Sequence, residues 1–153
     1  MTLLTFMILS FAISHAKAET STVFQITSNK PITEAYSDMQ TSMNDSRFFV
    51  VQEIDIGKNL SNFAEKWGDD YNKNKLTAIK SMVFCNGWYA NKISNLDLSM
   101  LGMCPLHLTL IEKDGKTTVL FNRPTAIAKG SPAYDVFVEI EDEVIAIIKN
   151  GLK

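Results

Sequence analysis

Residues 106–121, LHLTLIEKDGKTTVLF, consist of two runs of alternating apolar and polar side chains on either side of an Asp114-Gly115 dipeptide. Alternation with a period of two is typical of a β-strand with one buried face. An Asp-Gly pair between such runs favours a two-residue hairpin turn, because that turn needs positive φ at both central residues. The stretch therefore predicts an antiparallel hairpin in which Leu110 lies opposite Val119 and both side chains face the core.

Three runs upstream predict further strands of the same sheet. They cover residues 21–28, 47–56 and 76–85, and each has a strand-like alternation of side chains. The third run ends at Cys85, which shares one face of the strand with Val83, and we expect that face to turn towards the helices. Together with the hairpin, these runs predict a mostly antiparallel sheet of about five strands.

Apolar side chains that recur at intervals of three and four residues predict helices between the strands. The stripes are Ile32, Ala35, Tyr36, Met39 and Met43; Leu60, Phe63, Ala64 and Trp67; Trp88, Tyr89, Ile93 and Leu96; and Ala133, Val136, Phe137, Ile140, Val144, Ile147 and Ile148. We expect Trp67 to lie in the core, and Glu141 to lie with its acidic neighbours on a solvated face. The predicted fold class is α+β, in the order βαβ(α)β(α)ββα, with the long helices packed on one face of the sheet.

The N-terminal segment has the composition of a secretory signal peptide. Residues 3–13 are mostly apolar, and Ala16 and Ala18 are small residues at the two positions that a signal peptidase reads. We expect cleavage near Ala18 and a periplasmic or secreted single domain that covers residues 19–153. The apolar run is too short for a stable membrane span, which needs about 20 residues. A retained interfacial anchor is the alternative.

The charge of the chain argues against one class of partner. The formal net charge is −2 at pH 7, and no cluster of Lys and Arg stands out along the sequence. Nucleic acid is therefore not an expected partner, because binding to the phosphate backbone requires concentrated positive charge. No nucleotide, metal or protease motif is present, and we expect no cofactor.

The residues that could carry chemistry lie around the two cysteines. Cys85 ends one predicted strand and Cys104 precedes the next, and a short helical segment connects them. The candidate binding residues are Cys85, Asn86, Trp88, Cys104 and His107. A Cys-His dyad is disfavoured, because the odd separation of Cys104 and His107 sends their side chains to opposite faces of a regular strand.

Three roles for the cysteine pair remain open. Oxidising compartments favour disulfides, so a structural disulfide or two inert thiols is the simplest interpretation. The spacing is not CxxC, so thioredoxin-type exchange has no support. Thiolates and thioethers select cuprous copper, and Met82, Met100 and Met103 lie near the cysteines in the sequence. In regular strands, however, Met82 lies on the face opposite Cys85 and Met103 on the face opposite Cys104.

The order of these features resembles a known family. FCN at residues 84–86, a helical linker, GMCPLHLTLIEKDGK at residues 102–116 and a later proline resemble the bacterial domain family of unknown function numbered 302. The similarity runs from about Thr22 to Gly151. Gly87 and Pro105 depart from the proline and asparagine that are usual in the family at these positions. The resemblance implies a compact α+β domain without an assigned activity.

The sequence leads to two functional hypotheses. The first is an exported accessory domain that binds a small molecule or a periplasmic protein without catalysis, with a homodimer also open. The second is a thiol-based redox, sulfur-handling or soft-metal-binding protein that uses Cys85 and Cys104. We expect a binding role rather than an enzyme, because no activated nucleophile is evident.

Overall fold

The computed structural model describes residues 21–153, so the predicted signal segment, residues 1–18, lies outside the described residues. The element order is β1 (Val23–Ser28), α1 (Ile32–Asp45), β2 (Phe49–Asp55), α2 (Ile56–Ser61), α3 (Ala64–Trp67), η1 (Gly68–Asp70), β3 (Ala78–Cys85), α4 (Gly87–Leu96), η2 (Leu98–Met103), β4 (Leu106–Lys113), β5 (Lys116–Asn122), η3 (Pro124–Ala126) and α5 (Tyr134–Gly151). The predicted α+β class is confirmed.

The strands form one five-stranded sheet in the order β1-β5-β4-β3-β2, and every neighbouring pair is antiparallel. The predicted hairpin is confirmed, with Leu110 opposite Val119. Asp114 has φ 52° and Gly115 has φ 71°, as this two-residue turn requires. The hairpin therefore sets the register between β4 and β5.

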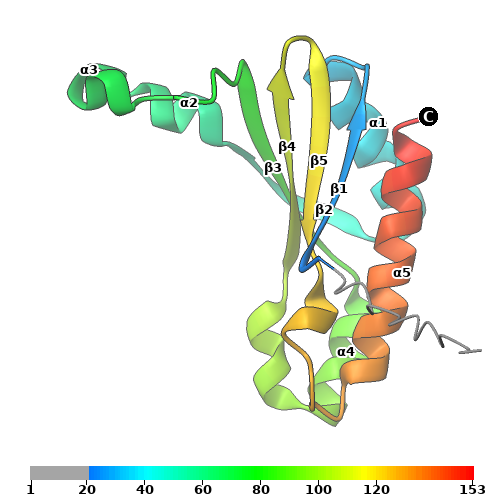
Figure 1. The fold of residues 1–153 in the computed structure, drawn as a ribbon. Helices are drawn as coiled ribbons and strands as arrows, with labels where there is room; N and C mark the ends of the chain where they lie inside the picture. The colour runs from blue at the N-terminus through cyan, green and yellow to red at the C-terminus, as the bar shows by residue number, and fades with distance from the viewer. Residues whose placement is uncertain (1–20) are drawn as a thin grey trace, which may run out of the picture.

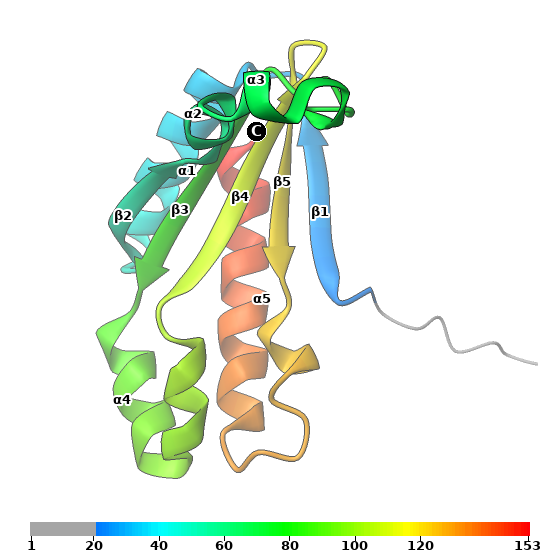
Figure 2. The same cartoon turned by 90° about the vertical axis from the view of Figure 1, so that its left-hand side faces the viewer.

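Helices α1 and α5 pack side by side on one face of the sheet (Figure 1). The α1 stripe predicted from the sequence is buried at every position, from Ile32 to Met43. On the sheet, Leu108, Leu110, Val119 and Phe121 are almost fully buried beneath these helices. The other face of the sheet carries no helix across its centre (Figure 2). We call it the open face.

The β3 face that turns towards the helices is the opposite of the predicted one. Met82 and Phe84 are fully buried, and they lie opposite Leu108 and Leu106 of β4. Side chains directly opposite in an antiparallel pair share a face, so Val83, which lies opposite His107, turns to the open face together with Ile79 and Ser81. The prediction was wrong because both faces of this strand are apolar, and periodicity alone does not choose between them.

Residues 56–70, comprising α2, α3 and η1, form an arm that projects away from the sheet on the side opposite α1 and α5 (Figure 1). The prediction that Trp67 lies in the core was wrong, because its side chain is 40% exposed. Helix α2 rests on β3 where Gly57 approaches closely: a Cβ at Gly57 would lie 3.1 Å from the Ile79 amide nitrogen. After α2 the arm no longer contacts the sheet, so the apolar side chains of α3 do not pack against the core.

Glu141 is buried rather than solvated, which corrects a second prediction. Its carboxylate accepts hydrogen bonds from Arg123 Nη1 at 2.6 Å, Thr125 Oγ1 at 2.5 Å and the Thr125 backbone N–H at 3.2 Å. These contacts attach η3 to α5. Removal of one partner from a buried pair of this kind costs about 3–5 kcal/mol, because the other charge is left uncompensated.

No helix within residues 21–153 combines the length and apolarity that crossing a membrane requires.

Replacement of Gly115 by valine should lower the free energy of unfolding by about 1 kcal/mol or more, because a β-branched residue is strained at positive φ. Gly102→Val is the matched control, because a Cβ at either position meets nothing within 4 Å and only Gly115 has positive φ. Urea denaturation of both variants measures the difference. Equal loss in the two variants would contradict the turn assignment.

Candidate functional site

The two cysteines meet where β3 and β4 end. The last residue pair in the β3–β4 register is Phe84 opposite Leu106. Cys85 is the final residue of β3, and Cys104 follows η2 directly before β4 begins. The chain that leaves β3 forms α4 and η2 and then returns, so the connection brings both thiols to the same end of the sheet (Figure 1).

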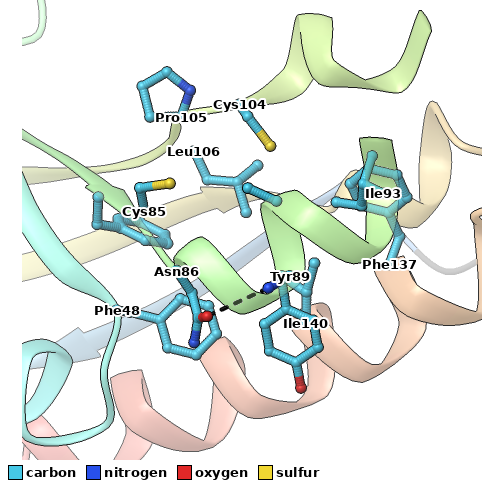
Figure 3. Close-up of a pocket in the computed structure, with 12 residues that line it drawn as sticks. Phe48, Cys85, Asn86, Tyr89, Ile93, Cys104, Pro105, Leu106, Phe137 and Ile140 are labelled. Carbon is cyan, nitrogen blue, oxygen red and sulfur yellow. Dashed lines mark hydrogen bonds between the residues drawn. The ribbon is translucent and has the colours of Figure 1, made fainter. Parts of the chain in front are cut away.

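Both cysteines line one small cavity, shown in Figure 3. Its volume is about 20 Å³, which is enough for roughly one water molecule or one ion. The rest of the lining is mainly apolar and comes from the sheet, from α4 and from α5. It includes Phe48, Phe84, Tyr89, Ile93, Leu106, Phe137 and Ile140. A drug-sized molecule does not fit, because such ligands occupy about 300–1,000 Å³.

The thiol of Cys104 is held in its protonated form. Burial raises the pKa of Cys104 above its ordinary value, and the neighbouring Cys85 thiol raises it further. Both cysteines are free, so the pair is not joined as a disulfide in this structure. A protonated, half-buried thiol is a poor nucleophile, because the thiolate is the reactive species.

Asn86 positions the helix that closes the cavity. Its Oδ1 accepts hydrogen bonds from the backbone N–H groups of Trp88 at 3.0 Å and Tyr89 at 3.4 Å, which makes Asn86 the N-cap of α4. The positive end of the α4 dipole therefore lies next to Cys85.

Tyr89 is a cavity residue that sequence reasoning assigned only to a helix stripe. Its ring stacks on Phe48 with centroids 5.9 Å apart, and its hydroxyl donates to Glu143 Oε1 at 2.6 Å. Burial and the Glu143 carboxylate both raise the pKa of Tyr89. The phenol therefore stays protonated and ties α4 to α5.

Two of the predicted site residues lie outside the cavity. Trp88 is 65% exposed on α4, where the Lys92 ammonium lies 5.8 Å from its ring centroid. His107 is exposed on β4 opposite Val83, so it turns to the open face. The structure thus brings Cys85, Asn86 and Cys104 together and separates them from Trp88 and His107.

A larger groove lies between the arm and β3, at the other end of the sheet. Its volume is about 680 Å³. The lining includes the apolar side chains of Leu60, Trp67 and Leu76, the ring of Tyr71 and the charged groups Asp55, Lys58, Asp70 and Lys73. No local sequence pattern indicates this groove, because it exists only where the arm turns away from the sheet. Among residues 21–153, no three His, Cys, Asp or Glu side chains are grouped as metal ligands would be.

The fold and these two sites define an α+β domain with a small thiol-lined cavity at one end of its sheet and an open groove at the other. The model of the family described as domain of unknown function DUF302 matches residues 24–152. The chain belongs to this family.

One similar solved structure is that of an uncharacterized conserved DUF302 protein from Bacillus stearothermophilus, with a TM-score of 0.73 and 18% sequence identity. The match covers 86% of this chain and 98% of that one, and at this identity it establishes a shared fold. No curated protein matches this chain.

The raised pKa of Cys104 predicts a shifted alkylation profile. In a Cys85→Ser variant, the pH midpoint for iodoacetamide labelling of Cys104 should lie above the free-thiol value of about 8.5, because burial persists without Cys85. In urea the midpoint should return to that value. Since the folded pKa is the higher one, the contribution of Cys104 to stability is complete below the unfolded pKa and is lost as the pH rises through the folded pKa. A folded midpoint at or below the urea value would contradict this prediction.

Proposed function

We propose that this protein is an exported, non-catalytic domain that binds a small amphipathic ligand in the groove between the arm and β3. The observation that carries the proposal is the groove itself, whose volume of about 680 Å³ falls in the range of small-molecule sites. The thiol cavity, at about 20 Å³, is too small for such a ligand.

The lining of the groove selects the class of ligand. Leu60, Trp67 and Leu76 form an apolar wall. Asp70 and Lys73 form an ion pair with each other. Lys58 makes no ion pair within the described part of the chain, and its backbone N–H is already used by the Asp55 cap of α2. An apolar body with one anionic group matches this combination.

The non-catalytic assignment rests on the positions of the reactive groups. Nucleophilic catalysis requires a nucleophile with a base beside it. His107 lies on the open face, away from the cavity that both cysteines line. The raised pKa of Cys104 also keeps its thiol protonated at neutral pH.

The amphipathic anion anilinonaphthalenesulfonate tests the groove. In a Trp88→Phe background, Trp67 is the only tryptophan, so binding in the groove should produce energy transfer from Trp67 to the bound dye. Tyr71→Ala and Lys58→Glu should each weaken binding by about tenfold, or about 1.4 kcal/mol. The Trp88→Phe change alone should leave the affinity unchanged. Circular dichroism checks that each variant is folded. Dye binding that neither groove substitution alters would overturn the proposal.

A second candidate function is soft-metal binding by the thiol pair. The observation that favours it is that two thiols share an apolar cavity of one-ion size. Thiolates select cuprous copper, and two sulfurs can hold this ion without further ligands. Each thiol would release a proton as the ion enters, and the N-terminus of α4 would offset the resulting negative charge.

Titration of the reduced protein with Cu(I) against the competing chelator bicinchoninate tests this candidate. One equivalent should bind tightly, and Cys85→Ser or Cys104→Ser should each abolish the tight binding. His107→Ala is the matched control, because this residue lies outside the cavity. If a single-cysteine variant still binds one equivalent with the same affinity, the two thiols do not form a joint site.

A further inference from the structure

The arm exposes an apolar surface that the rest of the chain leaves uncovered. Phe63 is 48% exposed and stacks on Trp67, with ring centroids 5.1 Å apart. Leu60, one turn earlier, is 36% exposed. Helix α2 contacts β3, whereas α3 has its main contacts with η1 in the arm itself. Exposed apolar area of this size on a projecting element is unfavourable in water unless a partner covers it.

The open face of the sheet carries several large apolar side chains among polar ones such as Ser81, Thr109 and Thr118. An antiparallel sheet with one solvated face normally carries polar side chains there. Here Ile54, Ile79, Val83, Ile111 and Leu120 are only partly buried, although no helix covers the centre of this face (Figure 2). The arm projects from this same side of the sheet (Figure 1). The arm and the open face thus lie on the same side of the sheet.

The open face has a hollow near the β4–β5 hairpin, bordered by two lysines and one aspartate. The hollow measures about 330 Å³, and its lining consists of Thr27, Leu76, Ile111, Lys113, Asp114, Lys116 and Thr118. The two lysines lie directly opposite each other in the register, and neither forms an ion pair with any residue from 21 to 153. Like charges in that position repel. An anionic group from a partner would relieve the repulsion.

The end of the arm carries such a group. Asp69 lies two residues after Trp67 and forms no ion pair within the described chain, whereas its neighbour Asp70 is paired with Lys73. The arm therefore presents an apolar stack followed by a carboxylate. The hollow presents Leu76 and Ile111 beside two ammonium groups and the single Asp114 carboxylate, so one positive charge is in excess. An apolar contact together with the Asp69 carboxylate complements this surface.

We propose that the partner is a second copy of this chain. In a two-fold symmetric pair with the open faces turned towards each other, the arm of each copy covers the hollow of the other. A single isologous contact then buries both exposed surfaces in each copy. Closed two-fold dimers are commonly formed by such self-complementary contacts. Phe63 occupies the hollow beside Ile111, and Asp69 pairs with Lys113 and Lys116. Leu60 and Trp67 also line the ligand groove, whereas Phe63 does not, so a substitution of Phe63 tests the dimer without removing a groove residue.

Sedimentation velocity over a wide concentration range tests the inference. The mature protein should sediment as a dimer that dissociates on dilution, and Phe63→Ser should weaken the dimer at least about tenfold. Trp88→Ser is the matched control: Trp88 is more exposed than Phe63 but lies on α4 at the other end of the sheet, so its loss should leave the dimer intact. Circular dichroism checks that both variants remain folded.

A charge reversal identifies the contact. Asp69→Lys and Lys113→Asp should each weaken the dimer, and the double variant should recover much of the lost affinity, because it restores an opposite-charge pair across the interface. Salt should weaken the wild-type dimer and the double variant alike. A monomer at every concentration would overturn the inference. An equal effect of Trp88→Ser and Phe63→Ser, or a double variant no tighter than the single ones, would do so too.

Discussion

The burial of Phe84 between Phe48 and Phe121 is the contact on which the rest of the structure depends. Its ring lies edge-on to Phe48, with centroids 6.0 Å apart, and 6.4 Å from the centroid of Phe121. Full burial of a phenylalanine contributes about 1.5–3 kcal/mol, and it also fixes a register, because a slip of one residue would move every β3 side chain to the other face. β3 ends one residue after Phe84, at Cys85, and Asn86 then caps α4.

The two ends of the sheet differ because their connections differ. At one end, the connection from β3 to β4 forms α4, which contacts α5, and then η2. This connection encloses both cysteines in apolar surroundings. At the other end, the route from β2 to β3 leaves the body as the arm, anchored where Gly57 meets the backbone of β3. The enclosed end suits an ion or inert thiols, whereas the open end offers a groove and an uncovered aromatic stack. The proposed ligand groove and the proposed partner surface therefore both lie at the end without the cysteines.

Local patterns determined much of this protein. The Asp114-Gly115 turn, the α1 stripe and the long apolar stripe of α5 are short-range features, and each holds in the structure because it depends on residues a few positions apart. The α+β class and the antiparallel sheet follow from them. The cysteines were identified as the chemically distinctive pair from residue type and from their places at strand ends.

Tertiary structure decided what periodicity leaves open. Glu141 is buried because η3 brings Arg123 and Thr125 onto α5, a contact that no local pattern encodes. Trp67 belongs to an apolar stripe like that of α1, yet it is exposed because the arm has no sheet beneath it. The face of β3 that meets the helices was set by the partner residues of β4, since both of its faces are apolar. The spacing of residues along the chain determines which side chains share a face. Only long-range packing determines whether that face contacts the core or solvent.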